Sequence, residues 1–204
     1  MIMKKNSMTL FIGEDLNSQR VRMALAEKSI TADVISVDPS SPPEVFMELN
    51  PDGALPLLVD RELVLDLASV ISEYLDERFP HPPLLPVYPV ARARSRMLIG
   101  QIINEWYPIV ENLENHFDEK ALASVTNSIY SITPLLEDST YYLSNEFSLV
   151  DCAMAPLLWR LKGHQVAVED HSPLLNRYCQ NVFSRDSFQI SLSEQDLGIL
   201  DEIE

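Results

Sequence analysis

Apolar and polar residues alternate along the first eighty positions in a pattern that predicts a small mixed sheet covered by helices. Short apolar runs typical of strands occupy residues 8–12, 33–37, 55–60 and 62–66, and the last two are close enough to form a hairpin. Apolar residues at helical spacing fill the longer segments around them, with Ser18 well placed as the N-cap of the first helix. The order β-α-β-α-β-β-α predicts an α/β thioredoxin-like domain.

A proline-rich segment follows this domain. Residues 80–90, PHPPLLPVYPV, contain five of the 14 prolines in the chain, and proline supplies no backbone amide for a helix interior or a central strand. We therefore predict a stiff linker. Beyond it, apolar residues recur at helical spacing. The predicted domains are residues 1–82 (thioredoxin-like), 83–91 (proline-rich linker) and 92–204 (all-helical).

Two local signals stand out in the helical half. Ser148 and Asp151 have the spacing of a capping box, in which both side chains bond amides at a helix start. Capping explains Asp151 better than a role as a catalytic acid does. The final residues 191–204, SLSEQDLGILDEIE, carry five acidic residues and no basic one. They are predicted to form a frayed acidic C-terminal tail.

The charge balance narrows the classes of partner. The 204 residues include 15 Lys and Arg against 31 Asp and Glu, a formal net charge of −16. Phosphate contacts need clustered basic side chains, so the composition argues against direct nucleic-acid binding. The arginines that do cluster, Arg20 with Arg22 and Arg92 with Arg94 and Arg96, are interpreted as solvated helix faces.

Nothing in the sequence supports a membrane span, a secretion signal or a metal site. Apolar runs stay short of the roughly 20 residues that a membrane helix needs, and the first residues, MIMKKNSMTLFIG, lack the apolar stretch of a signal peptide. A cytoplasmic location is the expectation. Cys152 and Cys179 lie outside any CxxC motif and are predicted to be buried free thiols, and the four histidines lack zinc-ligand spacing.

Three motifs together resemble the glutathione transferase superfamily. They are Asn50-Pro51 ahead of Leu55-Pro56, the helix entered from the strand ELVLD, and the box FSLVD. The resemblance implies a cis peptide bond before Pro56 and a Leu55 backbone that pairs with the cysteinyl part of glutathione. It also implies a homodimer with two-fold symmetry.

The same resemblance indicates where the chain departs from a working transferase. Those enzymes hold the γ-glutamyl carboxylate of glutathione with a Glu/Gln-Ser pair at the start of the helix after the fourth strand, where amides and the helix dipole attract an anion. Leu67 and Ala68 occupy these positions, and the thiolate-stabilising group would have to be Asn17 or Ser18. We therefore predict no catalysis and no cofactor. The residues of this vestigial glutathione cleft are Ser18, Leu55, Pro56, Leu67 and Ala68.

A narrower resemblance involves VRMALAEK (21–28), the segment 73–97 and FSLVDC (147–152). These segments resemble the stringent starvation protein A family, bacterial proteins with the transferase fold that associate with RNA polymerase. The resemblance implies a non-enzymatic transcription regulator of the starvation or stress response that contacts the RNA polymerase holoenzyme and its sigma factor. The implied partner-binding residues are Pro80, His81, Pro82, Pro83 and Tyr88.

Several alternatives stay open at the level of sequence. The proline segment could be a linker that packs only on its own chain, and Arg92, Arg94 and Arg96 could form dimer salt bridges in place of polymerase contacts. A glutathione-dependent transferase or peroxidase is the second functional hypothesis, and a small-ligand sensor is the third. A heterodimer with a paralogue also stays open.

Overall fold

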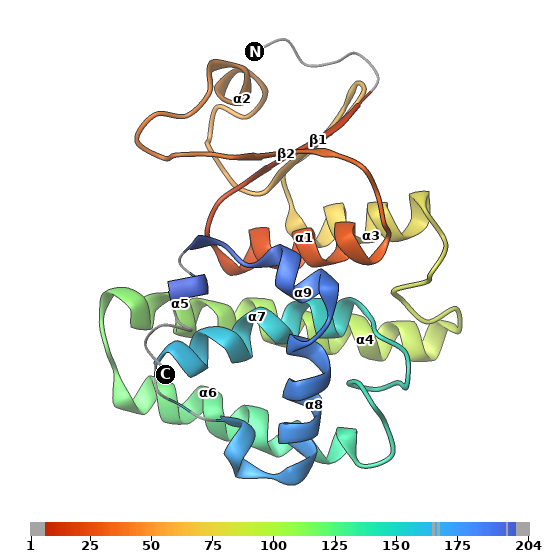
Figure 1. Cartoon of the computed structure of the whole chain (residues 1–204), viewed down its shortest axis with the longest axis vertical. Coiled ribbons are helices and arrows are strands. Elements are labelled where there is room, and N and C mark those ends of the chain that lie inside the picture. The colour runs from red at the N-terminus through yellow and green to blue at the C-terminus, as the bar shows by residue number, and fades with distance from the viewer. Residues whose placement is uncertain (1–6, 165, 167, 195, 199–204) are drawn as a thin grey trace.

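The N-terminal half consists of a four-stranded sheet with helices on its faces, as predicted (Figure 1). The computed structural model describes residues 7–164, 166, 168–194 and 196–198. The strand order is β2-β1-β3-β4, with β1 parallel to β2 and antiparallel to β3. The elements are β1 (Met8–Ile12), α1 (Leu16–Glu27), β2 (Asp33–Ser36), α2 (Glu44–Leu49), β3 (Leu57–Asp60), β4 (Leu63–Leu65) and α3 (Ala68–Arg78).

The central strand β1 contributes apolar side chains to the clusters on both faces of the sheet. All of its residues are buried, because strands flank it and helices cover it. α1 and α3 lie between the sheet and the helical half, and α2 lies on the opposite face (Figure 1). Leu10 joins Val21 and Ile71 in the first apolar cluster, and Phe11 packs against Phe46 in the second. Successive side chains of a strand point to opposite faces, so a continuous apolar run suits this position.

The C-terminal half is mostly helical. One long helix extends from Pro89 to Asn115, but its middle, Ile102–Trp106, has π geometry. Pro108 lacks the amide that would bond back to residue 104, and the helix widens just before it. The elements are α4 (Pro89–Gln101), η1 (Ile102–Trp106), α5 (Tyr107–Asn115), α6 (Glu119–Ile132), η2 (Thr133–Leu136), α7 (Leu149–Gly163), η3 (Val168–His171), α8 (Pro173–Phe183) and α9 (Asp186–Ser191).

Two helix starts differ from the sequence prediction. Ser18 is not the N-cap of α1, because Asp15 has the extended cap conformation and its Oδ1 accepts a hydrogen bond from the Ser18 amide at 2.9 Å. α4 begins at Pro89, inside the predicted linker, because proline is tolerated at the first helical position. The domain boundaries themselves stay a prediction.

The predicted frayed tail is wrong for its described residues, 191–194 and 196–198. The Asp196 side chain is buried and its Oδ1 accepts a hydrogen bond from Arg160 Nε at 2.8 Å. Trp159 Nε1 donates to the Asp196 carbonyl at 3.0 Å. A buried arginine needs a counter-ion, and this acidic residue supplies one. Residues 195 and 199–204 of the predicted tail lie outside the described residues.

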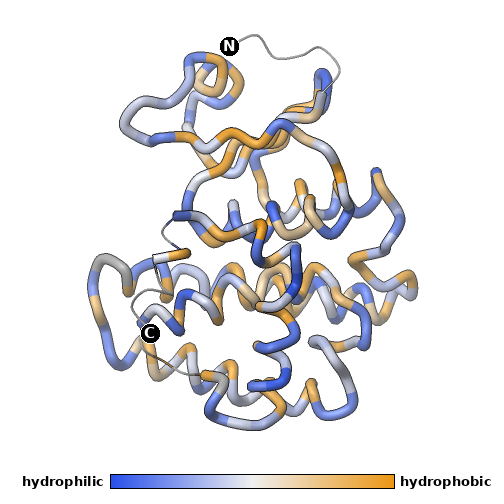
Figure 2. Tube along the Cα trace, viewed as in Figure 1, coloured by the Kyte–Doolittle hydropathy of each residue, from blue (hydrophilic) through white to orange (hydrophobic). Residues whose placement is uncertain are grey.

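Helix α7 forms the centre of the helical half, and every residue from Leu149 to Leu161 is buried. The predicted capping box at its start is confirmed, as are the buried free thiols Cys152 and Cys179. The surrounding helices carry alternating apolar and hydrophilic residues, which suits one face toward α7 and one toward solvent (Figure 2). One apolar cluster extends from α7 to α1, so the two halves share a core.

The Asp151 carboxylate is fully buried at this helix start. It accepts hydrogen bonds from the Ser148 amide at 2.9 Å, the Tyr142 amide at 3.2 Å and the Tyr178 hydroxyl at 3.0 Å. Burial raises the pKa of Asp151 to about 7, in opposition to these donors. The carboxylate therefore joins the loop before α7, the helix itself and α8.

Replacement of Asp151 by alanine is expected to lower the free energy of unfolding by about 3 kcal/mol. The reason is that four buried donors, the amides of Tyr142 and Ser148 and the hydroxyls of Ser148 and Tyr178, lose their acceptor. The matched control is Asp118→Ala. Asp118 caps α6 at an exposed position, where water replaces the lost bonds and the expected loss is about 1 kcal/mol. Urea unfolding of both variants measures the difference. Equal losses would contradict the role assigned to Asp151.

Candidate functional site

The turn before β3 keeps the backbone form that the glutathione transferase resemblance implies. The Leu55–Pro56 peptide bond is cis. Pro56 is buried, Leu55 is half-buried, and Asn50 Nδ2 donates a hydrogen bond to the Ala54 carbonyl at 2.7 Å. The turn therefore has the cis backbone that the resemblance implies.

The start of α3 offers no side chain to a carboxylate at its first two positions. Leu67 is the N-cap residue, forms no side-chain cap and is 63% exposed, and Ala68 is buried. The next hydroxyl, that of Ser69, accepts a hydrogen bond from Arg20 Nη2 at 3.1 Å. The backbone amides at this helix start remain, but the polar side chains that would strengthen anion binding are missing at Leu67 and Ala68.

Ser18 and Asn17, the two candidates for a thiolate-stabilising group, both bond within the protein. The Ser18 side chain is fully buried, donates its hydroxyl proton to Asp15 Oδ2 at 2.6 Å and accepts from the Gly13 amide at 2.9 Å. Asn17 Oδ1 accepts from Arg20 Nε at 2.9 Å. A serine hydroxyl has one proton to donate, so Ser18 has none left for a glutathione thiolate.

Sequence reasoning missed the role of Asp15 as the N-cap of α1. Its carboxylate stands at the opening of α1, where a thiolate would otherwise gain from the helix dipole. A second anion at this place would be repelled. Asp is among the preferred N-cap residues, and that preference could have identified it.

The interpretation of Arg20 and Arg22 as a solvated helix face is wrong for Arg20, which is 4% exposed. Its guanidinium bridges Asn17 of α1 and Ser69 of α3. Arg22 Nη2 donates to the carbonyls of Ile190 and Leu192 at 2.9 and 3.1 Å. These arginines therefore join elements of the structure, and periodicity along one helix does not reveal that.

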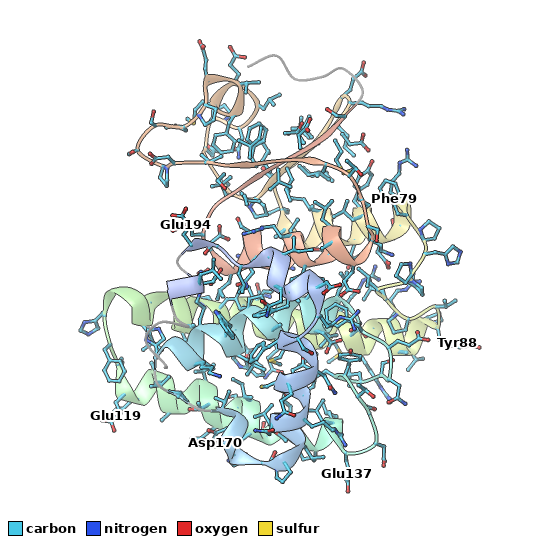
Figure 3. All side chains as sticks on the ribbon, in the orientation of Figure 1. Phe79, Tyr88, Glu119, Glu137, Asp170 and Glu194 are labelled. Atoms are coloured by element: carbon cyan, nitrogen blue, oxygen red, sulfur yellow. The ribbon has the colours of Figure 1, made fainter. Side chains whose placement is uncertain are left out.

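The predicted partner-binding residues lie together on the surface. Pro80, His81, Pro82 and Pro83 are all exposed, and we name them the proline ridge. Tyr88, 79% exposed, follows just before α4 and points away from the body of the molecule (Figure 3).

Burial and hydrogen bonds hold the chain between the proline ridge and α4 against the helical half. Leu84 and Leu85 are buried in the core of the helical half. The Leu84 carbonyl accepts from the Leu149 amide at 2.9 Å, and the Pro86 carbonyl accepts from Arg92 Nε at 2.8 Å. The segment therefore directs its leucines inward and its prolines outward.

A cavity of about 210 Å³ opens beside the proline ridge. Its walls come from the linker, from α4 and from the loop before α7. They include Pro83, Pro86 and Phe147 together with the charged residues Arg94 and Glu146. An apolar recess next to exposed prolines and a tyrosine has the composition of a protein-binding surface.

The three arginines of α4 have different environments. Arg92 bonds the linker, and Arg96 forms a bidentate pair with Glu73 at 2.9 and 2.6 Å. Arg94 is exposed beside the cavity. Two apolar residues of the same helix, Val90 and Met97, are also exposed. This side of α4 is therefore both charged and apolar.

Within the described part of the chain, no cluster of His, Cys, Asp or Glu is arranged to hold a metal ion. No helix in those ranges is long and apolar enough to cross a membrane.

Family comparisons and solved structures agree on the fold. Residues 16–83 match the glutathione S-transferase N-terminal domain, and residues 102–186 match the C-terminal domain. Glutathione transferase Omega 3C from Trametes versicolor superimposes with a TM-score of 0.82 at 24% identity, covering 93% of this chain and 90% of that one. A Tau class enzyme from mango has the same TM-score at 19% identity, with 98% of both chains covered.

Sequence relatives identify the family more specifically than the fold does. A stringent starvation protein A homolog of Coxiella burnetii is 44% identical over 96% of this chain and 96% of its own length. A homolog of the same name from Pasteurella multocida is 47% identical over 93% and 92%. A chloroplastic glutathione S-transferase of Arabidopsis thaliana is 26% identical over 86% of this chain and 68% of its own length. The chain therefore belongs to the stringent starvation protein A family and has the two-domain fold of the glutathione S-transferases.

Proposed function

We propose that this chain is a non-enzymatic, cytoplasmic regulator of transcription in the starvation response, and that it binds RNA polymerase holoenzyme through the proline ridge. The observation that carries the proposal is the exposure of all four ridge residues above a buried anchor at Leu84. The relatives named for stringent starvation support the physiological setting.

The chemistry of the proline ridge suits a protein partner. Prolines have a fixed φ and no amide donor, so they form an apolar surface with little entropy to lose on binding. Tyr88 adds an exposed aromatic ring, and the neighbouring cavity can receive an apolar side chain of the partner. The net charge of −16 favours basic protein surfaces and disfavours DNA.

The glutathione cleft supports the non-enzymatic part of the proposal. Its hydroxyl donor, Ser18, is committed to Asp15, and the helix start at Leu67 and Ala68 lacks a polar pair. Glutathione would therefore lose both the activation of its thiol and the side-chain contacts to its γ-glutamyl carboxylate. No cofactor is part of the proposed function.

A glutathione-dependent transferase or peroxidase is the second candidate. One observation favours it, the cis Leu55–Pro56 turn, which keeps the backbone frame for glutathione. The Arabidopsis relative is itself named as a glutathione S-transferase. This candidate needs a proton donor that replaces Ser18.

We also propose a homodimer formed through α4 and the β4–α3 region. Met97 is 76% exposed on α4, and Leu67 and Val70 are exposed at the start of α3. Met97 and Leu135 line an open groove between α4 and η2. A two-fold axis would bury these apolar surfaces in pairs.

The variant Pro80→Ala/Pro82→Ala/Pro83→Ala is expected to bind purified bacterial RNA polymerase holoenzyme at least about tenfold more weakly than the wild type, because the ridge loses rigidity and apolar contact. Fluorescence anisotropy with labelled protein measures the dissociation constants. The control Pro39→Ala/Pro51→Ala removes exposed prolines elsewhere and should bind normally. Equal binding by all three proteins would count against the ridge as the docking site.

Calorimetry with millimolar glutathione at neutral pH is expected to give no binding heat. The gain-of-contact variant Leu67→Gln/Ala68→Ser restores the polar pair and should bind more tightly than the wild type, by about tenfold or more. Micromolar binding by the wild type, with turnover of a chlorinated aromatic substrate that Ser18→Ala abolishes, would favour the enzyme instead.

Met97→Glu is expected to shift the protein from dimer to monomer, because the substitution places a charge in an apolar contact. Light scattering after size-exclusion chromatography measures the mass. Phe117→Glu is the control, since Phe117 is 61% exposed at a position away from this surface and its replacement should leave the dimer intact. A dimeric Met97→Glu protein would place the interface elsewhere.

A further inference from the structure

A buried ion pair lies directly behind the proline ridge. Lys28, at the C-terminus of α1, and Asp76, in α3, bring Nζ and Oδ1 to 2.6 Å. The Lys28 side chain has no exposed surface, and that of Asp76 is 11% exposed. The pair thus lies where the two helices of the thioredoxin-like domain meet the linker.

Each member of the pair also bonds the backbone of the proline segment. Lys28 Nζ donates to the Pro82 carbonyl, and the Leu84 amide donates to Asp76 Oδ1 at 2.7 Å. The two bonded groups are on either side of Pro83. One ion pair therefore fixes the orientation of the peptide units on both sides of Pro83.

The proline segment has few other means of fixing its backbone. Pro80, Pro82 and Pro83 have no amide hydrogen, so no regular ladder of backbone hydrogen bonds can form along them. Carbonyl oxygens and the amides of His81 and Leu84 are the groups that remain. Lys28 bonds one such carbonyl and Asp76 bonds the Leu84 amide.

Stability alone is a weak reason for this arrangement. Desolvation of two charges opposes their attraction, and an apolar pair of similar size often stabilises a protein as well as a buried ion pair does. An apolar pair could not bond a carbonyl and an amide at defined positions. The distinctive contribution of Lys28 and Asp76 is therefore the orientation of the segment that they bond.

We propose that Lys28 and Asp76 are positioning residues of the docking surface, which hold the proline ridge in the conformation that the partner binds. This inference rests on the proposed function, with a protein surface of RNA polymerase as the partner. A ridge held in place before binding loses less conformational entropy when it docks. The Leu84 carbonyl is bonded to α7 as well, so the ridge is tied to both halves of the chain.

The decisive variant is Lys28→Met/Asp76→Leu, which removes both charges together and leaves no unpaired buried ion. It should still fold cooperatively, with a urea midpoint somewhat below that of the wild type, because the Pro82 carbonyl and the Leu84 amide lose their partners. It should bind holoenzyme about tenfold or more weakly, because both tethers of the ridge are lost.

The matched control is Glu27→Leu/Arg185→Met. Glu27, the last residue of α1, pairs with Arg185 at 2.8 Å. No hydrogen bond joins either residue to the described ridge, and methionine at position 185 can still cover the Phe147 ring on which Arg185 lies. This variant removes another ion pair of the α1 end, one that joins the two halves of the chain, and should keep wild-type affinity for holoenzyme. Loss of binding in the control to the same extent would mean that any such pair matters, and would overturn the proposal.

Amide hydrogen exchange tests the hydrogen bond from the Leu84 amide to Asp76 independently of binding to holoenzyme. The Leu84 amide should exchange faster in Lys28→Met/Asp76→Leu than in the wild type, because its acceptor is gone. Unchanged exchange at Leu84, or unchanged affinity with faster exchange, would overturn the positioning role while the proposed function stands. A wild-type protein that does not bind holoenzyme would overturn the proposed function itself.

Discussion

The structure depends on the buried carboxylate of Asp151 at the start of α7. The loop before α7 and helix α8 donate hydrogen bonds to it, and α7 is thereby fixed at the centre of the helical half. The first amide of that helix, Leu149, then bonds the Leu84 carbonyl of the linker. The start of α7 therefore orders the helical core and, through the bond from Leu149 to Leu84, also positions the proline segment on the surface.

The glutathione cleft and the proline ridge show opposite uses of polar groups. In the cleft, the hydroxyls of Ser18 and Ser69 are bonded to Asp15 and Arg20, so side chains that could serve a ligand serve the fold. At the ridge, internal bonds involve backbone groups and leave the side chains exposed. On the proposed function, the same two-domain fold has lost a small-molecule site and presents a protein-binding surface.

Much of the architecture could be predicted because it rests on local regularities. Strand-like runs, helical spacing and the prolines that end helices identified the order of elements, and Ser148 with Asp151 identified the capping box. The start of α1 was misjudged because Asp15 and Ser18 are both good caps and their choice depends on backbone angles. Asp196 was assigned to a frayed tail because its partner, Arg160, is distant in sequence.

By itself, the sequence determined the two-domain order and the segment that forms the proline ridge, since these follow from composition, spacing and local backbone chemistry. It also indicated the family, through the resemblance of its motifs to known proteins. Tertiary structure decided which polar groups remain free for a partner. Ser18 and Arg20 form hydrogen bonds with neighbouring side chains of the protein. Lys28 and Asp76 come into contact only because α1 and α3 pack side by side. A hydrogen bond depends on positions in space to within a few tenths of an ångström, and spacing along the chain does not carry that information.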